Sequence, residues 1–226
     1  MYAQTNKIEL RVLVKGKPIT NYMHNGKNFV EGRSGSKFEI EIINRNPFKV
    51  EAVVSVDGTS VIDGKAAGEH SPGYLVEANS SVKIPGWKVN SDVAAAFEFT
   101  GKDNSYTTEM TGSSANNGVI GVMAFKDRNY RPVEFYAKAV PFRGIMPQAG
   151  GGAIWNSTTS TYGDTQPTLS SLEPYAVASA SMASETRAET LNNLGTGFGQ
   201  ATEFKTETVS FSRGDLQAVI AVFYDN

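Results

Sequence analysis

Short strand-like runs, each followed by turn-forming residues, repeat along most of this chain and limit the folds open to it. Residues 8–14 and 37–42 alternate apolar and polar side chains, which is the period of a strand with one buried face. Residues 50–56 form a third run, and Asp57-Gly58 follows it with the chemistry of a tight hairpin turn. Such spacing is typical of a β-sandwich or barrel. Further strands are predicted for residues 28–31, 59–62, 81–84, 94–100, 119–125, 133–140, 205–211 and 217–224.

The sequence therefore predicts an all-β fold, an antiparallel β-sandwich with a long irregular loop excursion before the C-terminal strands. We expect residues 1–143 to form the sandwich core with an N-terminal arm, and residues 144–200 to form the loop. Residues 201–226 then supply C-terminal strands that pair back with the core. Because strand side chains alternate between faces, one face of the last predicted strand is expected to carry Val219, Ala221 and Phe223.

The loop at residues 144–200 is rich in Gly, Ser and Thr and has no apolar period. One short helix is predicted within it, at residues 184–194. A polar loop of this length inside a compact domain is normally functional or disordered. We expect its few apolar side chains to contact neighbouring chains, with Trp155 as an aromatic anchor. Packing against the loop's own domain, as a lid, is the alternative. The predicted partner-binding residues are Ile154, Trp155, Leu169, Leu172 and Tyr175.

Residues that could carry catalysis do not form a recognisable motif. His24 and His70 both lie in turn-like stretches without a neighbouring nucleophile motif. Ser34 and Lys37 match Ser-x-x-Lys, but the flanking glycines favour a turn over the helix that this motif requires. Gly64-Lys65 lacks the spacing of a phosphate loop, and the glycines at 195–199 are interpreted as a tight turn. The sequence therefore predicts that the protein is not an enzyme.

Composition narrows the classes of ligand and partner. The chain has no cysteine, so it has neither disulfides nor thiolate metal sites. Asp57, Asp63 and Asp92 lack the spacing of a calcium loop, and no cofactor is predicted. The net charge of −2 and the absence of a basic run argue against nucleic acid. No run of about 18 apolar residues is present, and residues 1–7 do not resemble a signal peptide. We expect no membrane association, and folding in the cytoplasm.

Exposed aromatic side chains offer a different function, since they can stack on sugar rings. Core packing is the commoner use of aromatic residues in a β-protein. The pair of carboxylates that a glycosidase needs is not recognisable from spacing in the chain, so a hydrolase remains the third hypothesis. The candidate platforms for sugars are Phe29, Tyr74, Tyr106, Trp87 and Trp155.

Eight short segments form a recurring pattern along most of the chain outside the loop. They are residues 29–33, 53–58, 61–65, 73–74, 84–87, 118–122, 195–199 and 209–213. Together they resemble a family of largely uncharacterised proteins encoded by bacteria and by tailed bacteriophages. Members found in phages are similar to virion components, in particular to capsid decoration or cement proteins, and no catalytic residues carry over.

The resemblance implies a structural protein on the outer capsid surface of a virion. Its expected partners are the major capsid protein and neighbouring copies of itself, and its expected effect is to stabilise the shell by bridging capsid subunits. The alternative is a non-catalytic carbohydrate- or surface-binding module, for example on a virion vertex or tail.

Overall fold

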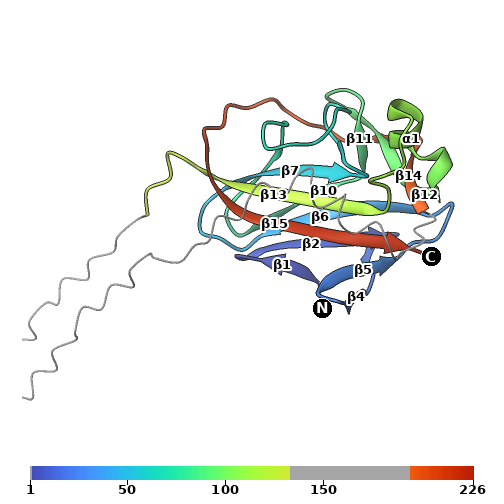
Figure 1. The fold of residues 1–226 in the computed structure, drawn as a ribbon. Helices are drawn as coiled ribbons and strands as arrows, with labels where there is room; N and C mark the ends of the chain where they lie inside the picture. Colours follow the sequence, from blue (N-terminus) through green and yellow to red (C-terminus); the bar gives the residue numbers. More distant parts are fainter. Residues whose placement is uncertain (1, 133–193) are drawn as a thin grey trace, which may run out of the picture. The chain divides into compact units, whose positions relative to one another are not determined.

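The computed structural model describes residues 2–132 and 194–226, which fold into two packed β-sheets (Figure 1). The predicted all-β sandwich is confirmed. Apart from one pair of strands, described below, neighbouring strands in both sheets run antiparallel. Predicted elements at 133–140 and at 184–193 lie outside the described residues.

The first sheet has eight strands in the order β1-β2-β6-β12-β11, with β3 paired to β2, β10 to β6 and β14 to β12. Pro85 separates β10, which pairs with β6, from β11, which pairs with β12. The strands are β1 Ala3–Thr5, β2 Ile8–Val14, β3 Lys17–Pro18, β6 Lys37–Asn44, β10 Ser80–Ile84, β11 Gly86–Lys88, β12 Val93–Gly101 and β14 Leu194–Glu203.

The second sheet has seven strands in the order β4-β5-β15-β13-β7-β8, with β9 paired to β7. The last strand, β15, lies between β5 and β13, and its pairing with β5 is parallel. The sheet is therefore mixed rather than purely antiparallel. Its strands are β4 Asn21–His24, β5 Lys27–Glu31, β7 Val50–Val56, β8 Thr59–Ser60, β9 Tyr74–Val76, β13 Val119–Asp127 and β15 Arg213–Asp225.

The core lies between the sheets and is built by the alternation that the sequence shows. On β6 the buried side chains alternate with more exposed ones, as expected when one face of a strand packs inward. At the centre, the ring of Phe38 stacks on Phe97 and Phe99, with centroid separations of 5.2 and 4.3 Å. Such stacked rings add specific geometry to the area that they bury.

Two short helices connect β12 to β13. They are the 3-10 helix η1, Lys102–Asn104, and the α-helix α1, Tyr106–Thr111. Ser105 caps α1 by accepting a hydrogen bond from the Thr108 amide, and Gly112 ends it with a φ of 70°. The sequence carries no signal for α1, because six residues are too few to show a helical period.

The longer strands in the first two-thirds of the chain were predicted, whereas β1, β3, β4, β9 and β11 were not. The runs at 8–14 and 50–56 are β2 and β7. The Asp57-Gly58 turn has the expected positive φ values of 54° and 79°. The predicted N-terminal arm is wrong for the described residues, because Ala3–Thr5 pairs with β2 and Ala3 is buried.

Three predictions near the C-terminus are wrong. The loop does not extend to residue 200, since β14 begins at Leu194. The glycines at 195–199 belong to that strand and not to a turn. Residues 205–211 are not a strand; the start of this segment is held by hydrogen bonds from the Phe204 and Thr206 amides to the Asp92 and Ser91 carbonyls.

Candidate interaction surface

The outer face of the second sheet is apolar, and β15 supplies its centre. Ala218, Ile220, Val222 and Tyr224 point into the core and are buried. The alternate residues Val219, Ala221 and Phe223 share the opposite face, as predicted from the sequence. This face is the outer one, and Val219 is 52% exposed.

Cross-strand pairing extends this apolar face over three more strands. Val219 lies opposite Met123 of β13, and Phe223 lies opposite Val119. On its other side Phe223 pairs with Phe29 of β5, and Phe29 pairs with Tyr22 of β4. Paired residues point to the same face of a sheet. We call this set the outer band: Tyr22, Phe29, Val119, Met123, Val219, Ala221 and Phe223.

The aromatic end of the outer band is bordered by cationic and imidazole side chains. The rings of Phe29 and Phe223 lie 5.4 Å apart between centroids. The ammonium group of Lys27 lies 5.3 Å from the centre of the Phe223 ring. His24 approaches Phe29 edge-on at 6.4 Å. An apolar centre with a polar border is the usual composition of a protein interface.

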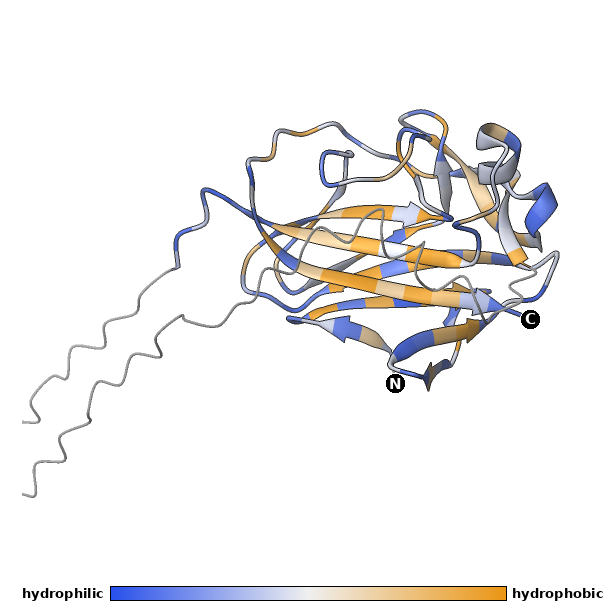
Figure 2. Ribbon diagram, viewed as in Figure 1, coloured by the Kyte–Doolittle hydropathy of each residue, from blue (hydrophilic) through white to orange (hydrophobic). Residues whose placement is uncertain are grey.

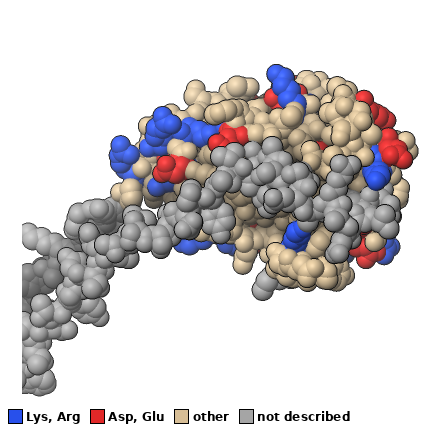
Figure 3. All heavy atoms as spheres, viewed as in Figure 1, with Lys and Arg blue, Asp and Glu red and all other residues tan. Residues whose placement is uncertain are grey.

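Few charges interrupt this part of the molecule. In Figure 2, β13 and β15 are coloured mostly as hydrophobic. In the described surface visible in Figure 3, Lys and Arg side chains gather mainly at one end. Within the outer band Tyr22 and Val219 are exposed, at 56% and 52%, and the other five residues are half-buried. An apolar patch that is open to solvent often marks a contact with another molecule.

A second cluster, the aromatic corner, places exposed side chains beside a buried indole and consists of Trp87, Tyr106, Met110 and Phe198. Trp87 is a core residue, and its indole N–H donates to the Gly197 carbonyl at 3.1 Å. The centre of the Tyr106 ring lies 4.7 Å from that of Trp87 and 5.4 Å from that of Phe198, with the rings tilted in both pairs. Phe198 and Met110 are exposed. The corner presents a small aromatic platform beside α1 and β14.

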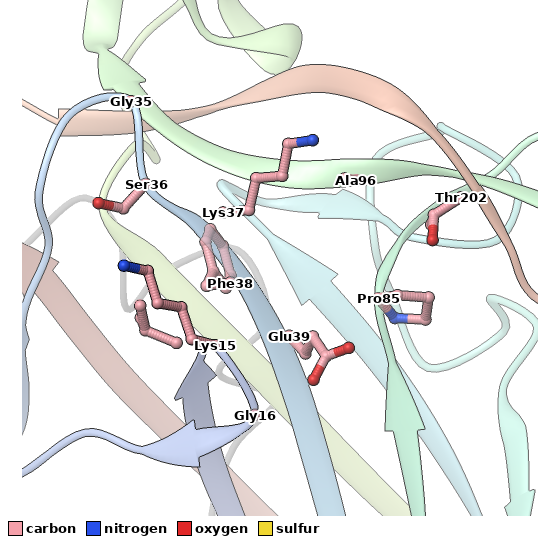
Figure 4. A pocket seen from close by; sticks show the side chains of 11 residues that line it. Lys15, Gly16, Gly35, Ser36, Lys37, Phe38, Glu39, Pro85, Ala96 and Thr202 are labelled. Atoms are coloured by element: carbon pink, nitrogen blue, oxygen red, sulfur yellow. The ribbon is translucent and has the colours of Figure 1, made fainter.

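A groove of about 570 Å³ lies on the first sheet and is lined by Lys15, Lys37, Glu39, Pro85 and other residues (Figure 4). The two lysine ammonium groups point in different directions in Figure 4 and do not converge on one position. Lys37 instead donates to the side-chain oxygen of Gln200 at 2.9 Å. The groove therefore lacks the convergent cations that would hold a single anion.

The residues considered for catalysis occupy separate parts of the fold. His24 lies on β4, His70 lies in the connection between β8 and β9, and Ser34 lies in the turn before β6. Within residues 2–132 and 194–226, no hydrogen bond joins either histidine to a serine. In the same residues, no group of three or more His, Asp or Glu side chains could hold a metal ion.

The aromatic residues considered as sugar platforms are divided by the fold. Trp87 and Tyr74 are buried in the core, whereas Phe29 lies in the outer band and Tyr106 in the aromatic corner. Trp155, Ile154, Leu169, Leu172 and Tyr175 lie outside the described residues. No helix in the described part of the chain is long and apolar enough to cross a membrane.

The outer band was only partly predicted, although the sequence contains a signal for it. Residues 218–224 are apolar without interruption, and residues 119–125 nearly so. Continuous apolar runs of this kind are typical of strands covered on both faces. Tyr22 of β4 and Phe29 of β5 join the outer band only through the pairing of strands, and the local sequence around them gives no sign of it.

Comparison of the chain with protein-family models, with curated proteins and with solved structures finds no match in any of the three.

Proposed function

We propose that the protein is a non-catalytic structural component of a bacteriophage virion, a capsid decoration or cement protein. It would bind the outer surface of the capsid through the outer band and bridge neighbouring major capsid subunits. The observation that carries this proposal is the apolar outer face of the second sheet. The sequence resemblance described above supplies the phage setting.

The outer band has the chemistry of the centre of an interface. Removing one Val or Phe side chain from water stabilises a contact by about 1.5–3 kcal/mol. The band side chains stand on paired strands of a packed sheet, so little conformational entropy is lost when they bind. Many identical contacts on one shell would add through multivalency, so each contact can be modest.

Replacing Val219 with arginine is expected to weaken binding to capsids at least about tenfold, because it places a charge in the middle of the apolar contact. Val219 is 52% exposed, so the folded protein itself accommodates the larger side chain. The measurement uses particles purified from a phage that lacks the gene. Purified protein is added to them, and the bound fraction is measured by sedimentation over a range of protein concentrations.

The matched control is Val89→Arg. Val89 is 54% exposed and follows β11 in the first sheet, away from the outer band. The two variants should have equal unfolding free energies and unequal binding. If wild-type protein does not bind the particles, the proposal is wrong. If Val219→Arg binds as well as Val89→Arg, the outer band is not the contact.

The aromatic corner favours a second candidate function, a non-catalytic carbohydrate-binding module. Phe198 is 53% exposed, and its ring lies against that of Tyr106 with the centroids 5.4 Å apart. Two adjacent aromatic rings offer an apolar face on which a sugar ring can stack. For this function, the wild-type protein would bind defined glycans on an array, and Phe198→Ala would abolish binding. Val219→Arg would leave glycan binding unchanged, which separates the two candidates.

A further inference from the structure

Asp57 is a fully buried carboxylic acid at the end of β7. Its side chain and backbone are inaccessible, with a relative exposure of 0%. It occupies the first position of the hairpin turn to β8, with a φ of 54°. A buried carboxyl group requires hydrogen-bond partners, and usually a cation as well.

The partners of Asp57 come from both sheets. One carboxyl oxygen accepts the Tyr224 hydroxyl of β15 at 2.5 Å and the Gly118 amide at 2.9 Å. The other accepts the amide of Thr196, on β14 of the first sheet, at 2.8 Å. The Thr196 hydroxyl in turn lies 2.7 Å from the Tyr224 hydroxyl. Asp57, Thr196 and Tyr224 thus form a triangle of hydrogen bonds that joins β14 to the second sheet.

We propose that the Asp57–Thr196–Tyr224 triangle is a proton-controlled link between the two sheets, tight when Asp57 is protonated and looser when it is ionised. With a neutral carboxyl group, a chain of hydrogen bonds can run from Asp57 through Tyr224 to Thr196. After ionisation the carboxylate is best stabilised by water, which reaches it only if this end of the sandwich opens. The inference does not rest on the proposed capsid function.

The surroundings of Asp57 support this behaviour. Burial raises the pKa of Asp57 from 3.8 to about 6, although hydrogen bonds from Tyr224 and from the amides of Thr196, Gly118 and Val119 act in the opposite direction. Tyr224 is the titratable group in contact with it, and it is neutral. Among the described residues, no lysine, arginine or histidine forms a hydrogen bond or ion pair with Asp57.

Glu9 shows what a counter-ion would change. Its carboxylate is also buried, and burial alone would raise its pKa. Hydrogen bonds from Arg11 at 2.6 Å and Arg45 at 3.0 Å outweigh burial and lower the pKa of Glu9 below its usual value. Glu9 therefore stays ionised at neutral pH. In the described part of the chain, Asp57 has no arginine or lysine beside it that would offset the effect of burial on its pKa.

The direction of the pH effect follows from the raised pKa. Between pH 3.8 and about 6 the closed state holds a proton that the open state has lost. The stabilisation of the closed state is complete below pH 3.8 and is lost as the pH rises through about 6. Between pH 5 and pH 7.5 the ratio of closed to open molecules should fall about tenfold.

Hydrogen exchange of the full chain tests the link directly. After correction for the intrinsic exchange rate at each pH, protection of the Thr196 and Gly118 amides should fall about tenfold between pH 5 and 7.5. In Asp57→Asn the same protection should not change with pH. Unchanged protection in the wild type, or an equal fall in Asp57→Asn, would overturn the proposal.

A second measurement keeps the proposal testable even if Asp57→Asn does not fold. The carboxyl carbon of Asp57 in the wild-type protein can be titrated by NMR. We expect its midpoint near pH 6, and the midpoint in Tyr224→Phe to be higher, because the hydroxyl that stabilises the carboxylate is missing. A midpoint below the ordinary value of 3.8 in the wild type would show a permanently ionised group and would refute the link.

Discussion

Gly86→Ala is expected to lower the free energy of unfolding by more than about 4 kcal/mol, a loss of stability that few single substitutions cause. A Cβ atom at this position would lie 1.9 Å from the Ala95 carbonyl oxygen and 2.5 Å from its carbon. These are backbone atoms of β12, at the point where pairing with β14 is irregular between Ala95 and Phe97. No side chain can rotate to relieve the overlap, so β11 and β12 must separate.

Gly101→Ala is the matched control for this prediction. Gly101 is also a strand glycine, at the end of β12, and a Cβ atom there would meet nothing within 4 Å. Its φ of −62° suits any residue. Urea denaturation of both variants should give a large loss for Gly86→Ala and a change within about 0.5 kcal/mol for Gly101→Ala. Similar losses in the two variants would show that contact with β12 is not the reason for glycine at position 86.

Arg213→Ala is expected to lower the free energy of unfolding by about 3 kcal/mol, the lower end of the effect of removing one partner of a buried ion pair, because the Arg213 side chain is still 24% exposed. The Arg213 guanidinium donates to both carboxylate oxygens of Glu51, at 2.9 and 2.5 Å. It also donates to the Ser71 carbonyl at 2.9 Å and to the Glu69 carbonyl. The Glu51 side chain is only 12% exposed, so without the arginine its charge stays in a poorly hydrated site.

An exposed pair in the same protein provides the comparison. Arg33 and Glu31 lie 3.4 Å apart, with side chains 80% and 54% exposed. Exposed pairs of this kind contribute little, so Arg33→Ala should change stability by less than about 0.5 kcal/mol. Adding Glu51→Gln to Arg213→Ala should restore part of the loss, because the unpaired charge is then absent. A double variant less stable than Arg213→Ala would contradict this explanation. The free energy of unfolding is measured by thermal and urea unfolding for the wild type, Arg213→Ala, Arg33→Ala and the double variant.

Local sequence patterns predicted strands where one face is buried and the other is exposed. β6 is such a strand, and its alternation of side chains identified it correctly. β14 was missed because its glycines suggested a turn. In the structure, glycine is needed there for close packing, since a Cβ at Gly195 would lie 2.5 Å from the Ser105 Cβ. That approach depends on the loop before α1, which lies about 90 residues away in sequence.

The candidate surface was harder to predict than the fold. Alternation placed Val219 and Phe223 on one face, but it did not show which face was the outer one. The aromatic end of the band forms because β5 pairs with β15 in parallel, and residues 28–31 pair with residues 222–225. A pairing between strands so distant in sequence leaves no local trace. The partner-binding residues predicted from the sequence, between positions 154 and 175, lie outside the described residues.

The position of β15 inside its sheet affects how the chain folds during synthesis. Among the described strands β15 is the one that pairs with both β5 and β13, and residues 213–225 are made long after both of them. On the ribosome, the second sheet stays in two pieces with unpaired strand edges until this segment emerges. Contacts between such distant segments also slow folding. From the time each strand is made until β15 emerges, the edges of β5 and β13 that β15 will cover stay unpaired. This is the period in which the nascent chain is most prone to aggregate or to need a chaperone.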